Sequence, residues 1–537
     1  MNGNLSHHDA IIIGAGIAGM YQLLRLRELG LQVQVFETGD NVGGTWYWNR
    51  YPGARFDSES YSYGYSFSPE LLDEWEWSEH FAAQPETLRY LNTVADKFDL
   101  RKDIRFNARV TEAVFNEPEA RWEIATEDGK RASAPFLITA VGPLSAPTLP
   151  NVEGIDDFGG FSCHTARWPK EPVEFGGKRV GVIGTGASGV QTIQEVAKTA
   201  AKLYVFQRTP NWCAPLNNSK ITTEEQRNIK ASYPEIFRKC RQTNGCFLHQ
   251  SDPRNTFEVS PEERLAHYES LYAAPGFGIW VGSFADTLID EAANAEMSAF
   301  VADKIRSRVK DPKVAEQLIP TNHGFGTRRV PLETNYYEVY NQDNVHLVDL
   351  RQTPLECVTA TGIQTSTTHY PLDMIVYATG FDAVTGALDR IDIRGRGGVK
   401  LADKWADRVS TYLGIQTRGF PNLFTLVGPQ NTATLCNIPR CIEQNVDWVT
   451  AAVDHLRQHG HRQMEPRAES EEEWTCTAEA MMQMSLFMKV NSWISGVNLN
   501  VPGKEQPRCV VYPGGAPAYR TQCDAEAAGG YTGFSLS

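Results

Sequence analysis

Two short glycine loops are the residues whose types and spacing most directly suggest chemistry. GAGIAG runs from Gly14 to Gly19, and GTGASG runs from Gly184 to Gly189. Glycines at this spacing allow a tight turn and a close approach of the backbone to a pyrophosphate, while the helix that follows supplies free N–H groups and partial positive charge. The two loops therefore predict two bound dinucleotides.

The residue after the second strand of each unit indicates which dinucleotide binds there. Glu37 lies 23 residues after Gly14, and Gln207 lies 23 residues after Gly184, with Arg208 next to it. A carboxylate accepts hydrogen bonds from a ribose hydroxyl but repels a 2′-phosphate, whereas Arg binds a phosphate well. We therefore expect FAD on the first loop and NADPH on the second. The predicted contacts are Gly14, Gly16, Gly19 and Glu37 for FAD, and Gly184, Thr185, Gly186, Ser188, Gly189, Arg208 and Thr209 for NADPH.

Each loop lies in a strand–turn–helix–strand pattern, which predicts an α/β fold with two Rossmann-like dinucleotide-binding domains. Charged, helix-forming stretches after Pro210 predict a helical insertion in the NADPH domain. The predicted strands are 10–13, 33–36, 179–183 and 203–206, and the predicted helices are 20–29 and 190–198. The expected limits are 1–145 and 386–537 for the FAD-binding domain, 146–215 and 325–385 for the NADPH-binding domain, and 216–324 for the insertion.

Bulk composition narrows the partners. The 537 residues carry a net charge of −14 without a basic block, which does not favour nucleic acid or an anionic membrane surface. No apolar run reaches the roughly 20 residues of a membrane span. The N-terminus lacks the pattern of a signal peptide, and ten scattered Cys suit a reducing compartment. We expect a cytoplasmic monomer without a metal site.

Between the two loops, FGGFSCHTARWP fits the pattern F-x-G-x-x-x-H-x-x-x-W-P at Phe158, Gly160, His164, Trp168 and Pro169. A second pattern, G-x-W-x-x-x-x-Y-P-G-x-x-x-D, fits the segment from Gly44 to Asp57, and GTRRVPLETNYYEVY follows from Gly326. On these motifs the chain resembles the type I Baeyer–Villiger monooxygenases, which are class B flavoprotein monooxygenases, and within them the phenylacetone and steroid monooxygenase branch. The resemblance implies FAD, NADPH and O2, and conversion of a small-molecule ketone to an ester or lactone, with sulfoxidation as a side activity.

The resemblance also assigns residues. Arg329 stabilises the anionic C4a-peroxyflavin of the family, and Asp57 orients Arg329 and balances its charge. His164 is expected to hold the interdomain linker in place rather than to transfer protons. The further family positions are Gly44, Thr45, Trp46, Asp57 and Tyr63 at FAD, Arg55, Asp57, Arg328, Arg329 and Trp493 at NADPH, and Pro143, Leu144, Leu435, Cys436, Ile438 and Trp493 in the substrate pocket.

The chain departs from its family at Arg328, where Lys is usual, at Glu333, and in a longer loop at 496–502. These differences, together with Cys436, leave the ketone open.

Three alternatives remain at this point. A flavin monooxygenase acting on nitrogen or sulfur shares the two loops but keeps its peroxide protonated. A pyridine-nucleotide disulfide reductase needs a redox-active Cys pair, and only Cys436 and Cys441 have suitable spacing. We expect these two not to form a redox-active pair, because they lie late in the chain and because residues five apart on a helix point in different directions. A non-catalytic nucleotide sensor is the third alternative.

Overall fold

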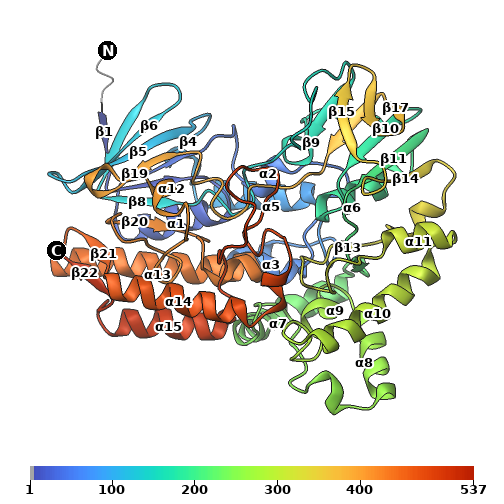
Figure 1. Cartoon of the computed structure of the whole chain (residues 1–537). Coiled ribbons are helices and arrows are strands. Elements are labelled where there is room, and N and C mark those ends of the chain that lie inside the picture. Colours follow the sequence, from blue (N-terminus) through green and yellow to red (C-terminus); the bar gives the residue numbers. More distant parts are fainter. Residues whose placement is uncertain (1–4) are drawn as a thin grey trace.

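The computed structural model describes residues 5–537, apart from the side chain of Thr434. Two five-stranded parallel sheets form its frame (Figure 1). In order, the first sheet contains β20 (Leu423–Thr425), β8 (Phe136–Thr139), β2 (Ala10–Ile13), β3 (Val33–Phe36) and β4 (Ile104–Arg105). The second contains β14 (Val345–Asp349), β11 (Lys202–Gln207), β10 (Arg179–Ile183), β18 (Met374–Tyr377) and β9 (Phe161–His164). These are the two predicted dinucleotide-binding units.

The two units repeat one local design. β2 leads through the first glycine loop into α1 (Ile17–Glu28), and β10 leads through the second into α6 (Ala187–Val196). Both helices begin three residues earlier than predicted, because the last glycine of each loop already lies inside the helix. Gly14 and Gly184 both have φ of +105°, a backbone conformation that residues with a side chain rarely adopt.

The chain crosses between the units more than once. β20, and β19 (Asp392–Arg394) of a further sheet, come from the last third of the sequence but join strands from the first third. That further sheet has the order β1 (Leu5–His7), β7 (Arg131–Ala134), β6 (Arg121–Thr126), β5 (Val110–Asn116) and β19. Three C-terminal helices, α13 (Ile438–His459), α14 (Ala468–Gln483) and α15 (Ala516–Ala528), lie on the same side of the molecule (Figure 1).

The predicted insertion is helical. It contains α7 (Thr223–Gln242), α8 (Pro261–Ala273), α9 (Gly278–Val281), α10 (Glu291–Arg308) and α11 (Pro312–Leu318). Its two ends are joined where β12 (Ala214–Pro215) pairs with β13 (Leu332–Glu333). The pairing positions the segment that precedes β13, which carries Arg328 and Arg329.

The remaining elements are short or peripheral, except for the 14-residue helix α5. They are α2 (Thr45–Trp48), α3 (Ser60–Tyr63), α4 (Pro69–Glu74), α5 (Gln84–Lys97), α12 (Leu401–Lys404), β15 (Leu355–Thr359), β16 (Gly362–Thr365), β17 (His369–Pro371), β21 (Met464–Pro466) and β22 (Phe534–Leu536). Among residues 5–537, no helix combines the length and the hydropathy that a membrane-spanning segment needs.

The helix–strand packing generates a first prediction. A Cβ on Gly19 would lie 1.8 Å from the Gly14 carbonyl oxygen, and a Cβ on Gly189 would lie 2.3 Å from that of Gly184. Gly19→Ala is expected to destabilise the protein by about 2–3 kcal/mol and to release FAD, because backbone must move. Thermal unfolding and flavin absorbance of the purified variant measure both effects. Gly176→Ala, where nothing lies within 4 Å, is the control; equal behaviour of the two variants would contradict the prediction.

Candidate functional site

Arg329 and Asp57, which are 272 residues apart, form an ion pair. Arg329 Nη2 donates to Asp57 Oδ2 at 2.5 Å, and Nη1 donates to the Val330 carbonyl at 2.6 Å. The guanidinium also lies over the Phe277 ring, 4.8 Å from its centroid. The side chain of Asp57 is 3% exposed and that of Arg329 is 27% exposed. The carboxylate is thus enclosed, while the cation keeps a surface that a ligand can reach.

Burial raises the pKa of Asp57, and Arg329 opposes that rise through its charge and its hydrogen bond. Oδ1 of Asp57 is buried and has no hydrogen-bond partner among the described residues. A carboxylate in this situation depends on the neighbouring cation to remain ionised. Arg329 and Asp57 therefore act as a unit, and the free Oδ1 can accept a hydrogen bond from a bound cofactor.

The first glycine loop has the features that a pyrophosphate requires. The N-terminus of α1 has no side-chain cap and no acidic residue in its first turn. The backbone of Gly44 approaches so closely that a Cβ there would lie 2.9 Å from the Gly16 Cα. Glu37 is buried, and its two oxygens accept the N–H groups of Ala15 and Gly39, both at 2.7 Å. Its remaining lone pairs are available to a ribose. This loop fits FAD.

Aromatic residues extend the predicted flavin side. Trp46 Nε1 donates to the Tyr63 hydroxyl at 3.0 Å, and Tyr63 stacks on Phe56 with ring centroids 4.3 Å apart. Thr45, the first residue of α2, is exposed. The aromatic contacts fix the positions of the three rings relative to one another.

The second loop has the same open helix N-terminus. A Cβ on Gly186 would have no neighbour within 4 Å, so the space beside this residue is open. The helix α6 has no side-chain cap and no acidic residue in its first turn. Thr185 Oγ1 donates to the Thr209 carbonyl at 2.9 Å. Arg55 is held near this helix: its carbonyl accepts from Gln191 Nε2, and its guanidinium contacts Glu79 at 2.9 Å.

Arg208 and Arg328 fit the 2′-phosphate of NADP. The pKa of Arg328 is lowered, first by burial and then by the charge of Arg208. Nε of Arg328 is buried without a hydrogen-bond partner. Neither Arg forms an ion pair within residues 5–537. A bound anion would accept hydrogen bonds from these guanidinium groups and neutralise their charge.

The fingerprint segment, residues 158–169, contacts both the second sheet and the second glycine loop. β9 of this segment pairs with β18, and Thr165 Oγ1 lies 3.2 Å from Ser188 Oγ in the second loop. The ring centroids of His164 and Phe381, which follows β18, lie 5.8 Å apart. Nδ1 of His164 accepts a hydrogen bond from the Ala166 N–H. Burial lowers the pKa of His164 to about 4, so the ring is neutral at pH 7. The remaining fingerprint residues have structural contacts. The partly buried Phe158 packs against the cluster of Ile183 and Phe206, and the exposed Gly160 faces the Phe158 ring and the Asp373 carbonyl. Trp168, ahead of Pro169, is buried against Phe175.

Four of the predicted substrate-pocket residues pack in the large apolar core of the first unit. Leu435, Ile438 and Trp493 are partly buried against one apolar cluster, which includes the buried Cys436. Pro143, followed by the partly exposed Leu144, lies on the linker after β8, where its carbonyl accepts the Val384 N–H at 2.7 Å. No contact between Trp493 and Arg329 is present among the described residues.

The helical argument against a Cys436–Cys441 pair is wrong, because the two residues form a disulfide. The helical argument failed because the two residues do not share a helix. Cys436 has an extended backbone, with φ of −132° and ψ of 179°, and α13 begins only at Ile438. The chain therefore turns between the two sulfur atoms.

Some residues of the site were not foreseen. Phe277 lies in the helical insertion, and Asn211 Nδ2 donates to the Arg329 carbonyl at 3.3 Å while its Oδ1 is buried and unpartnered. Both are distant from Arg329 in sequence and belong to no motif. The position of Asn211 between Gln207 and β12 is the only signal that could have indicated it.

The comparisons with known proteins agree with this geometry. The flavin-binding monooxygenase-like family model matches residues 8–220. The chain is 49% identical over 535 residues to 2-oxo-Delta(3)-4,5,5-trimethylcyclopentenylacetyl-CoA monooxygenase of Pseudomonas putida, covering 98% of each. It is 40% identical over 527 residues to a Baeyer-Villiger monooxygenase of Pseudooceanicola batsensis, covering 98% of this chain and 95% of the relative. A crystal structure of OTEMO in complex with FAD and NADP has a TM-score of 0.96 at 49% identity, over 99% of this chain and 100% of that one.

The chain is therefore a flavin-dependent monooxygenase. Within that class it belongs to the Baeyer–Villiger monooxygenases and uses FAD and NADPH. The disulfide reductase and the nucleotide sensor that the sequence left open do not describe this family.

The buried His164 predicts a pH dependence of stability. Its pKa is about 4 in the folded protein against 6.5 in the unfolded chain. As the pH falls below 6.5, His164 becomes protonated in the unfolded chain but not yet in the folded protein. The contribution of neutral His164 to the free energy of unfolding is therefore complete above pH 6.5 and is lost as the pH falls toward 4, at up to about 1.4 kcal/mol per pH unit. We expect His164→Gln to flatten the fall in the free energy of unfolding over this window. The exposed His459→Gln should leave it unchanged; identical pH profiles of the wild type and His164→Gln would contradict the prediction.

The Arg208 and Arg328 pair predicts cofactor selectivity. Arg208→Ala and Arg328→Ala should each raise the KM for NADPH about 10–100-fold, because a hydrogen bond to a charged group contributes about 1.5–3 kcal/mol. The KM for NADH, which lacks the 2′-phosphate, should change little and serves as the control. Steady-state oxidation of the two nucleotides measures the ratio, and a proportional loss with both would contradict the assignment.

Proposed function

We propose that Arg329, positioned by Asp57, stabilises the negative charge on oxygen when this monooxygenase converts an alicyclic ketone to a lactone. One observation supports the proposal above all others: the partly accessible guanidinium of Arg329 is held by a buried carboxylate 272 residues away in the sequence. Attack on a carbonyl places negative charge on oxygen, and a fixed cation in a water-poor site stabilises that charge without reorganising.

The chain's own groups have distinct proposed roles. Reduced FAD, when bound, supplies the electrons that activate O2 for insertion. Arg329 remains protonated throughout, because a guanidinium cannot be deprotonated near neutral pH. Asp57 is a positioning residue: it fixes the Arg329 plane and keeps its charge balanced. Phe277 covers one face of the guanidinium, which limits access of water to that side.

The ketone class is inferred from the pocket and from the relatives. The predicted lining residues Leu435, Cys436, Ile438 and Trp493 offer mainly apolar surface. The Pseudomonas relative is named for a cyclopentenyl substrate. A pocket lined by these apolar side chains suits a ring ketone, whose carbonyl is the only polar group that must be oriented. Sulfoxidation is proposed as a side activity.

Nitrogen or sulfur oxygenation is the main alternative. Those reactions transfer an electrophilic oxygen, for which the peroxide must stay protonated. A permanent cation at the reaction centre favours the anionic form instead. The Arg329–Asp57 pair therefore supports ketone oxygenation as the principal activity.

We also propose the domain limits predicted from the sequence, a cytoplasmic location and a monomeric state. The strand connections support the limits, since β19 and β20 return to the first unit after residue 386. Eight of the ten Cys are free, which suits a reducing compartment.

Arg329→Ala tests the role of the cation. Oxidation of NADPH by the wild type should be stimulated by ring ketones and should yield a product heavier by one oxygen. In Arg329→Ala, product formation should fall about 10²–10³-fold, the usual effect of losing an oxyanion-stabilising group, while slow NADPH oxidation continues. Product mass spectrometry and NADPH absorbance give the two rates.

The control is Arg238→Ala on the exposed face of α7, which should behave like the wild type. Lactone formation at an unchanged rate in Arg329→Ala would overturn the assignment of this residue. Ketone-independent consumption by the wild type, with oxygenated sulfides or amines as products, would overturn the substrate class.

A further inference from the structure

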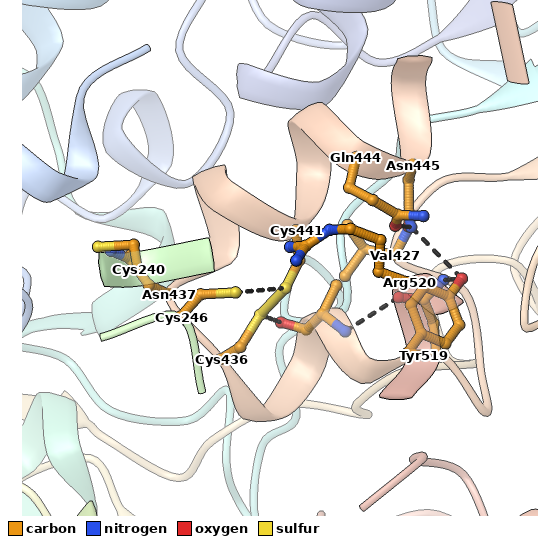
Figure 2. The surroundings of a disulfide bond; sticks show 12 residues. Cys240, Cys246, Val427, Cys436, Asn437, Cys441, Gln444, Asn445, Tyr519 and Arg520 are labelled. Atoms are coloured by element: carbon orange, nitrogen blue, oxygen red, sulfur yellow. Dashed lines mark hydrogen bonds between the residues drawn. A yellow bond between two sulfur atoms is a disulfide. The ribbon is translucent and has the colours of Figure 1, made fainter. Parts of the chain in front are cut away.

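Three cysteine sulfurs meet where the helical insertion contacts α13 (Figure 2). Cys436 and Cys441 are joined as a disulfide, and Cys246 Sγ lies 3.8 Å from Cys441 Sγ. The three sulfur atoms lie within 4.8 Å of one another, and all three residues are buried. Cys246 follows α7, whereas Cys441 is in the first turn of α13, 195 residues later.

The backbone holds the third cysteine at this position. Cys246 has φ of +54°, a left-handed conformation that a residue with a side chain rarely adopts. Next to it, the Gly245 carbonyl accepts the Asn437 N–H at 2.7 Å. Asn437 Nδ2 in turn donates to Ser62. These contacts bring the Cys246 loop directly against the turn that contains the disulfide.

The charges around Cys246 bear on its reactivity. Burial raises the pKa of its thiol, while Arg520 and Arg440 oppose the rise. A thiolate is the attacking species in disulfide exchange. The two cations stabilise that thiolate, and burial makes it a minor form, so exchange is expected to be slow.

We propose that Cys246, Cys436 and Cys441 form a thiol–disulfide exchange site in which Cys441 pairs with either of the other two. The Cys246 thiolate attacks Cys441 Sγ, the Cys246–Cys441 bond forms, and Cys436 leaves as a thiolate that takes up the proton lost by Cys246. The exchange involves no net oxidation. All three sulfurs are close enough to hold a metal ion, but two of them already share a bond, which favours exchange.

The first disulfide needs an oxidant, for which a hydroperoxide such as H2O2 is the proposed class. Cys436, at 7% exposure, is the most accessible of the three. Its thiol attacks the peroxide, forming a sulfenic acid and water. The Cys441 thiol then displaces the sulfenic hydroxyl as a second water, and the Cys436–Cys441 bond forms. Two thiols are oxidised and one peroxide is reduced to two waters.

The two pairings constrain different parts of the enzyme. The Cys436–Cys441 bond closes a short turn next to Leu435 and Ile438. The Cys246–Cys441 bond would instead join the insertion to α13 and release that turn. If these residues line the ketone pocket, a point that rests on the proposed function, the pairing changes the KM for ketone about 2–10-fold.

Thiol counting and peptide mapping of the FAD-loaded enzyme test the site without relying on activity. After H2O2 and acid-quenched alkylation under denaturing conditions, eight thiols per chain should react, against all ten after dithiothreitol. Trypsin cleaves after Arg241 and Arg440, so the three cysteines fall on separate peptides and each pairing has its own mass. Both the Cys436–Cys441 and the Cys246–Cys441 peptides are expected.

Cys436→Ser should direct oxidation to a Cys246–Cys441 bond, and Cys246→Ser should leave only Cys436–Cys441. The matched control is Cys240→Ser, a buried cysteine in α7, the helix that precedes Cys246, which should retain both pairings. Ten free thiols in the peroxide-treated wild type would overturn the proposal, as would a Cys436→Ser variant without the Cys246–Cys441 peptide. If the pairings form but the KM for ketone does not change, the exchange site stands and the pocket assignment fails.

Discussion

The ion pair between Arg329 and Asp57 is the constraint on which the rest of the site depends. The buried carboxylate of Asp57 relies on the neighbouring cation, and that cation can serve chemistry only if part of it stays accessible. Meeting both conditions requires two loops, 272 residues apart, to be fixed to a fraction of an ångström. The β12–β13 pairing, the Asn211 contact and the Phe277 ring all act on the Arg329 segment. The helical insertion thus helps to shape the centre as well as cover it.

The two glycine loops show how one local design is given two roles. Both have the same order of strand, turn and helix, and the first glycine of each loop has the same φ. The difference lies at the end of the second strand, where Glu37 bonds backbone N–H groups of its own loop and Gln207 is followed by Arg208. A buried carboxylate in one unit and two cations, unpaired among the described residues, in the other are the charge difference on which the proposed separation of FAD and NADPH rests.

Local patterns predicted the parts of this structure that local physics determines. The strand–turn–helix units were correct because β-branched runs and glycine spacing act over a few residues, although α1 and α6 begin inside the loops. Arg329 and Asp57 could be named only through a family motif, since no spacing rule joins residues so far apart. Cys436 and Cys441 were misjudged because a periodicity argument assumed a helix that begins only at Ile438. Cys246 and Phe277 carried no signal, because long-range packing alone brings them to their positions.

The return of β20 to the first sheet has a consequence for biosynthesis. All strands of the second sheet have been synthesised once the chain reaches Tyr377. The first sheet, in contrast, lacks its edge strand until residues 423–425 emerge. Domains generally fold as units while the chain is synthesised. The nicotinamide unit can therefore close on the ribosome while the flavin unit, although it begins first, still exposes β8 along one edge. An exposed edge invites pairing with other chains, so the interval between these two events is when the nascent protein is most exposed to aggregation.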